Sequence, residues 1–322
     1  MSDKSILVMR ATGVQGRGAI KHLTKSGWKV HALVTDKTSE RAVNLKSFGP
    51  QVVLHEGTWK EPAKVEAALQ GCRSLLFNQL PSFTDDTEIQ EAKVVLSLAK
   101  RTGVQHIVFP TTLALMDPNA REKLERFSAA PAILNKGAVE ELVKASGMTW
   151  TLLRPGYFNT NLLPPLVHWM YPRMKEGKMI NSYGPDCVLT LIDPDDIGAF
   201  VAAAVNDPKR FGEQAIPLVG DNLRFDDLMK TYTQACGYPF EVVYRTDEET
   251  EAEMANPFVS GHVMVRDFEK MVNMEEIKKW GIPLTSFKQF LENHKDELPR
   301  GPVKDGESVV VPYAASLMPG NK

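Results

Sequence analysis

The sequence has few cysteines, no long apolar run and almost no net charge, and each of these absences excludes a class of protein. The three cysteines, at positions 72, 187 and 236, form no C-x-x-C motif, which argues against a disulfide framework or zinc site and for a reducing compartment. The apolar runs fall well short of the roughly 20 residues that span a membrane. A net charge of −2, without a block of Lys or Arg, gives no field to attract nucleic acid or acidic membranes. The seven histidines show no metal-ligand spacing.

We therefore expect a cytoplasmic protein, with a nuclear pool left open, that binds a small molecule rather than nucleic acid, membrane or metal. The chain has 322 residues, of which 43% are apolar and 24% charged, as in an ordinary globular protein. This length allows one large α/β domain and a smaller lobe.

Short apolar segments alternate with helical patterns over the first 155 residues. The segments are rich in Val, Ile and Leu and apolar throughout, as strands buried on both faces of a parallel sheet must be. The expected strands are Ser5–Met9, Lys29–Val34, Val52–His55, Ser74–Phe77, His106–Phe109 and Thr149–Leu153. The expected helices are Gly16–Ser26, Glu40–Phe48, Glu61–Gln70, Asp86–Thr102 and Asn135–Ser146. The predicted fold is an α/β, doubly wound parallel (Rossmann) sheet.

The regular alternation stops after residue 155. Residues 156–300 mix Pro, Gly and aromatic residues with helical patterns, and one further strand is expected at Ala215–Val219. In doubly wound proteins such segments cover the carboxyl edge of the sheet, where ligands bind. We therefore predict a dinucleotide-binding domain over 1–155 and a smaller, irregular substrate lobe over 156–300, interleaved with the core. The Pro/Gly-rich tail, 301–322, is either disordered or an extended arm, and the chain is expected to be a monomer or a homodimer.

The turn after the first expected strand has the composition of a phosphate-binding loop. Ala11-Thr12-Gly13-Val14-Gln15-Gly16 follows that strand and opens a helix. Glycine lets the backbone approach a pyrophosphate, and the helix N-terminus offers free N–H groups and a positive dipole end. A tight turn without a ligand is the alternative.

These residues resemble the Gly-Ala-Thr-Gly-x-Gln-Gly turn of NmrA-like proteins, which are atypical short-chain dehydrogenase/reductases. Further segments resemble the family in the same order, over about residues 5–295: Gly71–Phe77, Gly103–Phe109, Leu153–Asn161 and Ile192–Gly198. The resemblance implies a bound nicotinamide dinucleotide. Arg10 stands where the family turn has its first glycine. The turn can accommodate a side chain there if φ is negative, so we expect Arg10 to weaken dinucleotide binding without excluding it.

The resemblance also implies which residues contact the dinucleotide. They are Arg10, Thr12, Gly13, Val14, Gln15, Gly16, Thr35, Lys37, Asn78, Gln79, Thr111, Lys136, Pro155, Gly156, Tyr157 and Phe158. After the second strand, Asp36 suits a ribose hydroxyl, whereas Lys37 and Arg10 suit a 2′-phosphate. Two cations against one acid favour NADP(H) over NAD(H). The alternative is that Lys37 is a solvated loop charge.

The resemblance identifies three candidate catalytic residues. Lys136 falls at the family's lysine position and would contact the ribose or act as acid/base, but Ala132 replaces the usual tyrosine four residues earlier. A solvent-facing Lys136 is the alternative. Thr112, beside Thr111 at the end of the fifth strand, would bond substrate or cofactor, unless it is structural. Tyr157 would donate a proton, or it packs against the second lobe.

The missing tyrosine narrows the chemistry. Reduction of a carbonyl makes an alkoxide that needs a nearby acid, whereas hydride addition to an iminium or a positively charged conjugated centre does not. We therefore predict an NADP(H)-dependent oxidoreductase of specialised (secondary) metabolism, acting on a bulky aromatic or alkaloid-like molecule. A redox-mediated cyclisation that returns the hydride is a further hypothesis. The alternative function is a non-catalytic, NAD(P)-sensing transcriptional regulator, which the arginine in the turn and the missing tyrosine favour.

Overall fold

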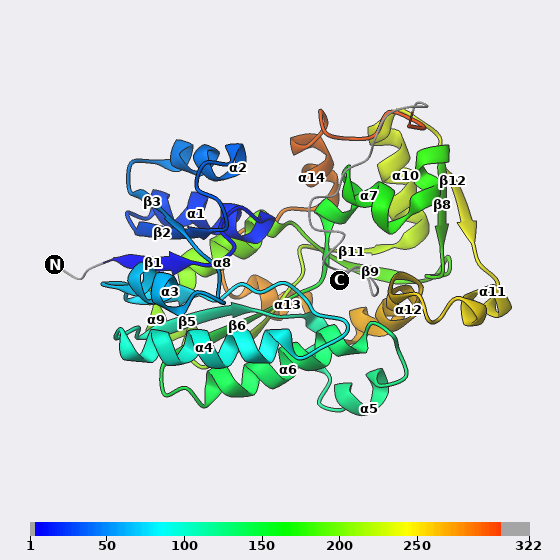
Figure 1. The fold of residues 1–322 in the computed structure, drawn as a ribbon. Helices are drawn as coiled ribbons and strands as arrows, with labels where there is room; N and C mark the ends of the chain where they lie inside the picture. Colours follow the sequence, from blue (N-terminus) through cyan, green and yellow to red (C-terminus); the bar gives the residue numbers. More distant parts are fainter. Residues whose placement is uncertain (1–3, 304–322) are drawn as a thin grey trace.

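The fold is organised around one seven-stranded parallel sheet (Figure 1), seen in a computed structural model that describes residues 4–303. The strand order is β10-β6-β5-β4-β1-β2-β3. Strands β2 and β3 extend the sheet on one side of β1 and the later strands extend it on the other, so the switch point, where doubly wound sheets bind their ligands, lies between β1 and β4. The strands are β1 (Ser5–Val8), β2 (Lys29–Val34), β3 (Val52–Glu56), β4 (Ser74–Leu76), β5 (His106–Pro110), β6 (Thr149–Pro155) and β10 (Gln214–Leu218). The predicted fold class is confirmed, and the predicted strands differ from these only at their ends.

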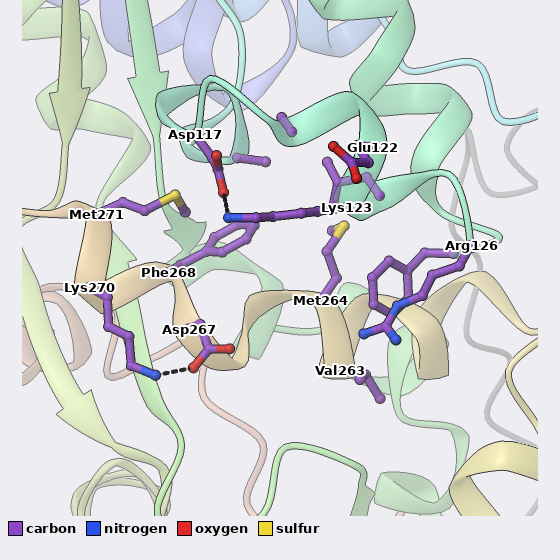
Figure 2. A pocket seen from close by; sticks show the side chains of 14 residues that line it. Asp117, Glu122, Lys123, Arg126, Val263, Met264, Asp267, Phe268, Lys270 and Met271 are labelled. Carbon is purple, nitrogen blue, oxygen red and sulfur yellow. Dashed lines mark hydrogen bonds and ion pairs between the residues drawn. The ribbon is translucent and has the colours of Figure 1, made fainter.

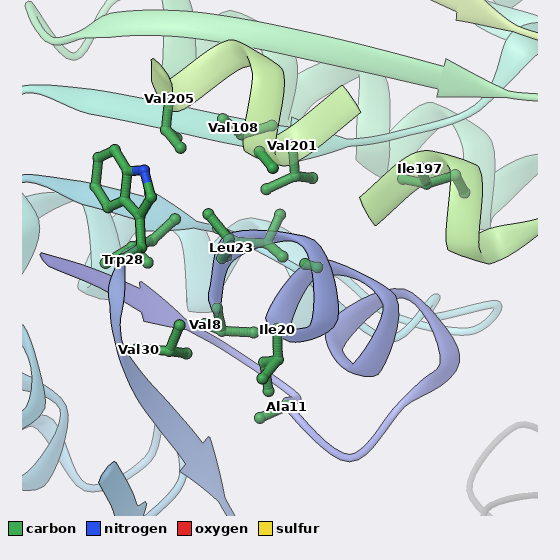
Figure 3. Close-up of a cluster of buried hydrophobic side chains, with 14 of the residues drawn as sticks. Val8, Ala11, Ile20, Leu23, Trp28, Val30, Val108, Ile197, Val201 and Val205 are labelled. Atoms are coloured by element: carbon green, nitrogen blue, oxygen red, sulfur yellow. The ribbon is translucent and has the colours of Figure 1, made fainter. Parts of the chain in front are cut away.

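Helices cover both faces of the sheet and explain why its inner strands are mostly apolar. Successive side chains of a strand point to opposite faces. Ile6 and Val8 accordingly join the core beneath α1 and α8, while Leu7 and Met9 join the core beneath α3, α4 and α6. Figure 3 shows the first of these cores. The helices are α1 (Val14–Lys25), α3 (Pro62–Leu69), α4 (Thr87–Arg101), α6 (Ala130–Lys144) and α8 (Pro194–Asn206).

Three of the five predicted helices differ from the structure by at most two residues at either end, and the other two differ by more. α6 begins at Ala130 rather than Asn135, because Pro131 lies in its first turn, where a missing N–H is tolerated. Lys136 therefore lies inside a helix and not at its start. The segment Glu40–Phe48 divides into α2 (Glu40–Val43) and the 3₁₀ helix η1 (Asn44–Phe48).

The C-terminal half adds small sheets and short helices over the carboxyl edge of the main sheet (Figure 1). Its strands are β7 (Tyr157–Phe158), β8 (Lys178–Asn181), β9 (Val188–Ile192), β11 (Asp221–Arg224) and β12 (Glu241–Tyr244). Its helices are η3 (Asn159–Leu162), α7 (Leu166–Met170), η4 (Pro172–Glu176), α10 (Phe225–Cys236), α11 (Asp247–Ala252), α12 (Pro257–Met264), η5 (Val265–Met271), α13 (Met274–Lys278) and α14 (Phe287–Asn293). The short helix α9 (Pro208–Phe211) directly precedes β10 and lies at the opposite, amino edge of the main sheet (Figure 1). Two further short helices, η2 (Leu113–Met116) and α5 (Ala120–Leu124), follow β5.

This half has a core of its own, rich in Tyr, Phe and Met and separate from the two cores of the main sheet. The division into domains at residue 155 stays a prediction, and most of the predicted tail lies outside the described residues. Within residues 4–303, none of the helices has the length and apolar character needed to cross a bilayer. In the same range, no group of three or more His, Cys, Asp or Glu side chains is placed to hold a metal ion.

Candidate functional site

The turn between β1 and α1 presents backbone amides rather than side chains to the carboxyl edge. Gly13 is the N-cap of α1 and has no side chain to cap the first N–H groups, and the first turn holds no acidic residue. A Cβ on Gly16 would lie 2.6 Å from the Arg10 carbonyl oxygen, so glycine is required where helix and turn pack together. The positive end of α1 is therefore open to an anion.

Arg10 occupies this turn with a left-handed backbone. Its φ is +49°, so the negative φ that would accommodate a side chain without strain is not found. The conformation follows from the turn itself, because the Arg10 carbonyl accepts a hydrogen bond from the Gly13 N–H at 3.0 Å. The guanidinium lies against α4, where Nη2 is 3.3 Å from Oε2 of Glu91, a side chain only 2% exposed. The Arg10 side chain is thus tied to the neighbouring helix.

The charged residues after β2 make contacts that the sequence did not predict. The Asp36 carboxylate accepts hydrogen bonds from the backbone N–H and the hydroxyl of Thr38, at 2.7 and 2.6 Å. These bonds lower the pKa of Asp36 and commit its Oδ1 to the local turn. Arg41, which sequence reasoning missed, donates from Nη2 to the Thr12 carbonyl at 3.0 Å. Lys37 is exposed in the same loop. The Arg41 guanidinium therefore approaches the glycine turn from the β2 side.

Buried polar atoms without partners lie at the ends of β1 and β4. Among the described residues, Arg10 Nε, Gln15 Oε1 and Gln79 Oε1 have no hydrogen-bond partner. Gln15 also donates from Nε2 to Asn78 Oδ1 at 3.4 Å, which links the glycine turn to the segment after β4. Unpaired buried donors and acceptors are costly. These three atoms lie where a polar ligand bound between β1 and β4 could supply the missing hydrogen bonds.

Lys136 is largely buried, which rules out the solvent-facing alternative. Its Nζ lies 2.6 Å from Oε1 of Glu88 on α4, with 13% of the lysine side chain and none of the glutamate side chain exposed. The other Glu88 oxygen accepts a hydrogen bond from the Ser82 N–H at 2.9 Å. Because the carboxylate is held on both sides, the ammonium has a fixed position.

Lys136 lines a cavity of about 250 Å³ at the carboxyl ends of β5 and β6, which we call the Lys136 cavity. It is lined by Phe83, Thr112, Ala129, Ala132, Ile133, Lys136, Pro155, Gly156, Tyr157, Leu189, Thr190, Met264, Val265 and Phe268. The structure thus brings together all three candidate catalytic residues. Gly156 is required at this point, because its Cβ would lie 2.2 Å from the Thr190 carbonyl oxygen.

Two predicted site residues, Thr111 and Phe158, stabilise the fold and do not line this cavity. The Thr111 hydroxyl is buried and donates to Glu140 at 2.7 Å, and the same carboxylate pairs with Arg154 at 2.6 Å. Phe158 packs against the core beneath α1 and α8. Thr112 lines the cavity, and its hydroxyl also accepts from the Ala114 N–H at 3.4 Å.

The Tyr157 hydroxyl begins a chain of three buried phenols. It lies 2.9 Å from the Tyr171 hydroxyl, which lies 2.7 Å from that of Tyr183. Burial raises the pKa of all three tyrosines well above the ordinary value. The ring of Tyr157 lines the Lys136 cavity while its hydroxyl is engaged in the core of the lobe. This geometry favours the packing interpretation of Tyr157.

Comparison with known proteins places the chain in one family. A model of the NmrA-like family matches residues 2–296. An NAD(P)H azoreductase from Xenophilus azovorans is 28% identical over 77% of this chain and 80% of its own length. NmrA, a negative transcriptional regulator solved with NADP, superposes with a TM-score of 0.70 and 20% identity over 90% of this chain and 95% of its own. An NADPH-dependent quinone oxidoreductase from Escherichia coli gives 0.68 and 19% over 89% and 98%.

The solved structures are 20% and 19% identical to this chain, so they establish its fold. The family model establishes its family. Its matched region contains the glycine turn, Lys136 and the segments that line the cavity. The relatives include both reductases and a regulator. The chain belongs to the NmrA-like family.

Proposed function

We propose that this chain is an NADP(H)-dependent oxidoreductase that reduces an aromatic, multi-ring small molecule. The observation that carries the proposal is Lys136, an ammonium fixed by a fully buried carboxylate and facing a cavity lined mostly by apolar side chains. Ligand sites are typically apolar cavities with a few fixed polar groups. A dinucleotide sensor has no need of such a cavity beside its binding crevice.

The residues at the carboxyl edge fit a dinucleotide. The amides of the turn over residues 13–16 suit the pyrophosphate, and the unpartnered Gln15 and Gln79 oxygens suit ribose hydroxyls. Lys37 and Arg41 suit a 2′-phosphate, whereas Asp36 is committed to its own turn, which supports NADP(H) over NAD(H). The printed cofactors of the azoreductase and of the solved relatives support the same assignment.

When bound, the nicotinamide supplies a hydride to the substrate. Lys136 can serve as a fixed hydrogen-bond donor, because a lysine ammonium carries three N–H bonds and Glu88 uses one. It can orient the ribose or the polar group of the substrate. The apolar walls exclude water from the reacting centre.

The shortage of acids in the cavity supports the narrower substrate class. Ala132 stands where the family tyrosine would be, and the Tyr157 hydroxyl is bonded to Tyr171. An iminium or conjugated, quinone-like centre needs no strong acid for hydride addition. A cyclisation that returns the hydride, as part of specialised metabolism, is the finer form of this proposal, and a product of unchanged mass would support it.

Oxidation of NADPH by the purified chain, followed by absorbance with a panel of quinones and iminium dyes, tests the proposal. We expect Lys136→Met to lower turnover about a hundredfold, while NADPH affinity stays within about threefold. Lys144→Met is the control, because Lys144 is a second lysine of α6 that pairs with a glutamate, the exposed Glu141, and does not line the cavity. NADPH binding without oxidation by any compound would instead support the sensor. Steady turnover of simple aldehydes would contradict the narrower substrate class.

A further inference from the structure

A second cavity of about 630 Å³ lies beside the Lys136 cavity, and we call it the outer cavity (Figure 2). Ala114, Ala120 and Phe127, from η2, α5 and the segment after α5, form one wall. Val263 and Met264 of α12 and Phe268 of η5 form the opposite wall. The cavity therefore lies between the segment that follows β5 and the C-terminal lobe.

The two cavities share part of their lining. Met264 and Phe268 line both of them. Both side chains come from one continuous stretch of α12 and η5, and Met264 is an unbranched side chain that repacks readily. Side chains of this single stretch therefore border both cavities.

The volumes indicate that one ligand uses both cavities. Sites for drug-sized ligands usually measure about 300–1,000 Å³. The Lys136 cavity alone, at about 250 Å³, is below this range, whereas the outer cavity lies well within it. A bulky substrate with its reducible centre near Lys136 needs space of the kind that the outer cavity provides.

The lining of the outer cavity suits an uncharged, apolar group. Two of its rim cations already have partners, since Lys123 pairs with Asp117 and Lys270 pairs with Asp267 (Figure 2). Arg126 lies over the ring of Phe127, 4.7 Å from its centroid. The remaining charges of the lining, on Arg126 and Glu122, are opposite in sign, so the lining carries no net charge. An anionic or cationic ligand would gain little here.

We propose that the outer cavity binds a neutral hydrocarbon extension of the substrate whose reducible centre lies in the Lys136 cavity. This inference rests on the proposed function and adds the substrate class: an aromatic core that carries an apolar chain or further rings. Met264 and Phe268 form the passage between the two parts of the site.

Binding of naphthoquinone and of geranyl-naphthoquinone, measured by quenching of tryptophan fluorescence, tests this inference without requiring turnover. In the natural chain we expect the geranyl compound to bind at least about tenfold more tightly, because its chain leaves water. Ala120→Phe fills the outer cavity and should remove this advantage, while the affinity for naphthoquinone stays unchanged. Ala63→Phe, at an exposed position of α3, is the control. Met271→Trp fills the cavity from the opposite wall if Ala120→Phe does not fold.

Equal affinities for the two quinones in the natural chain would overturn the inference, as would a geranyl advantage that survives both filling variants. The proposed function fails separately. If the tighter binding of geranyl-naphthoquinone is lost in the filling variants but no quinone oxidises NADPH, the inference about the outer cavity is supported and the proposed reductase activity is not. If naphthoquinone is reduced but the geranyl chain adds no affinity, the proposed reductase activity is supported and the inference about the outer cavity is overturned.

Discussion

Mutation of Arg10 and Glu91 can separate two contributions to stability, the ion pair between them and the left-handed backbone of Arg10. Arg10→Gly releases a left-handed conformation that costs an L residue about 1–2 kcal/mol. It also leaves Glu91, 2% exposed, without its cation. Breaking a buried pair costs about 3–5 kcal/mol, which we reduce to about 2–3 because 29% of the Arg10 side chain is exposed. The net expectation for Arg10→Gly is a loss of about 1 kcal/mol in the free energy of unfolding.

The second change, Glu91→Gln, should then have opposite effects in the two backgrounds. With Arg10 present it leaves a partly buried guanidinium unpaired and destabilises the fold. In the Arg10→Gly background it removes an uncompensated buried charge and should restore about 2 kcal/mol. Urea denaturation followed by tryptophan fluorescence measures all four variants, and dinucleotide affinity should stay within a few fold because glycine is the family residue at this turn.

The exposed pair of Arg101 and Glu66 provides a matched cycle, in which we expect a coupling of less than about 1 kcal/mol. The reasoning is refuted if Glu91→Gln destabilises the Arg10→Gly background as it does the natural chain. It is also refuted if Arg10→Gly alone makes the protein more stable, since the backbone strain would then outweigh the ion pair.

Three further predictions concern cofactor choice, pH and the phenol chain. Arg41→Gln should raise the dissociation constant of NADPH about tenfold and leave that of NADH unchanged, measured by calorimetry; equal losses would remove Arg41 from the 2′-phosphate site. Burial raises the pKa of Asp196 to about 6, so the folded state binds a proton more tightly than the unfolded state. The resulting penalty of up to about 3 kcal/mol at pH 7 is relieved as pH falls from about 6 to about 4. Asp196→Asn should flatten this pH dependence of unfolding, and an unchanged profile would contradict it. Tyr183→Phe should cost about 1–2 kcal/mol, because the Tyr171 hydroxyl loses one of its two hydroxyl partners; a neutral result in the same denaturation assay would mean that this hydrogen bond adds no stability.

The central sheet could be predicted because burial on both faces leaves a strong pattern. Ile6, Leu7 and Val8 are all fully buried, so β1 is apolar without alternation, and the same holds for its neighbours. The strands of the C-terminal lobe are two to five residues long and leave no such pattern, so only β10 was predicted beyond residue 155. Their existence depends on pairing between distant segments.

The candidate site was predictable in its position and not in its pairings. The glycine turn marked its position, but the link between Lys136 and Glu88 joins two residues that are 48 positions apart in the sequence and depends on how α4 and α6 pack. The contact of Arg41 with Thr12 depends likewise on the path of the β2–α2 loop. Oligomeric state and the expected cytoplasmic location stay predictions.

The central claim is that the amides at the start of α1 hold the pyrophosphate of a nicotinamide dinucleotide. Calorimetric titration of NADPH into the purified chain and into Gly13→Trp tests it most directly. Gly13 has φ −74°, which L residues adopt readily, and an added Cβ would lie 3.3 Å from the Arg10 carbonyl oxygen, so the turn must shift slightly to accept a side chain. The indole would then occupy the anion site. Val53→Trp, on the exposed face of the edge strand β3, is the control. We predict one bound equivalent in the natural chain and the control, and no detectable binding in Gly13→Trp with folding retained. Unchanged affinity in a folded Gly13→Trp, or no binding by the natural chain, would contradict the account.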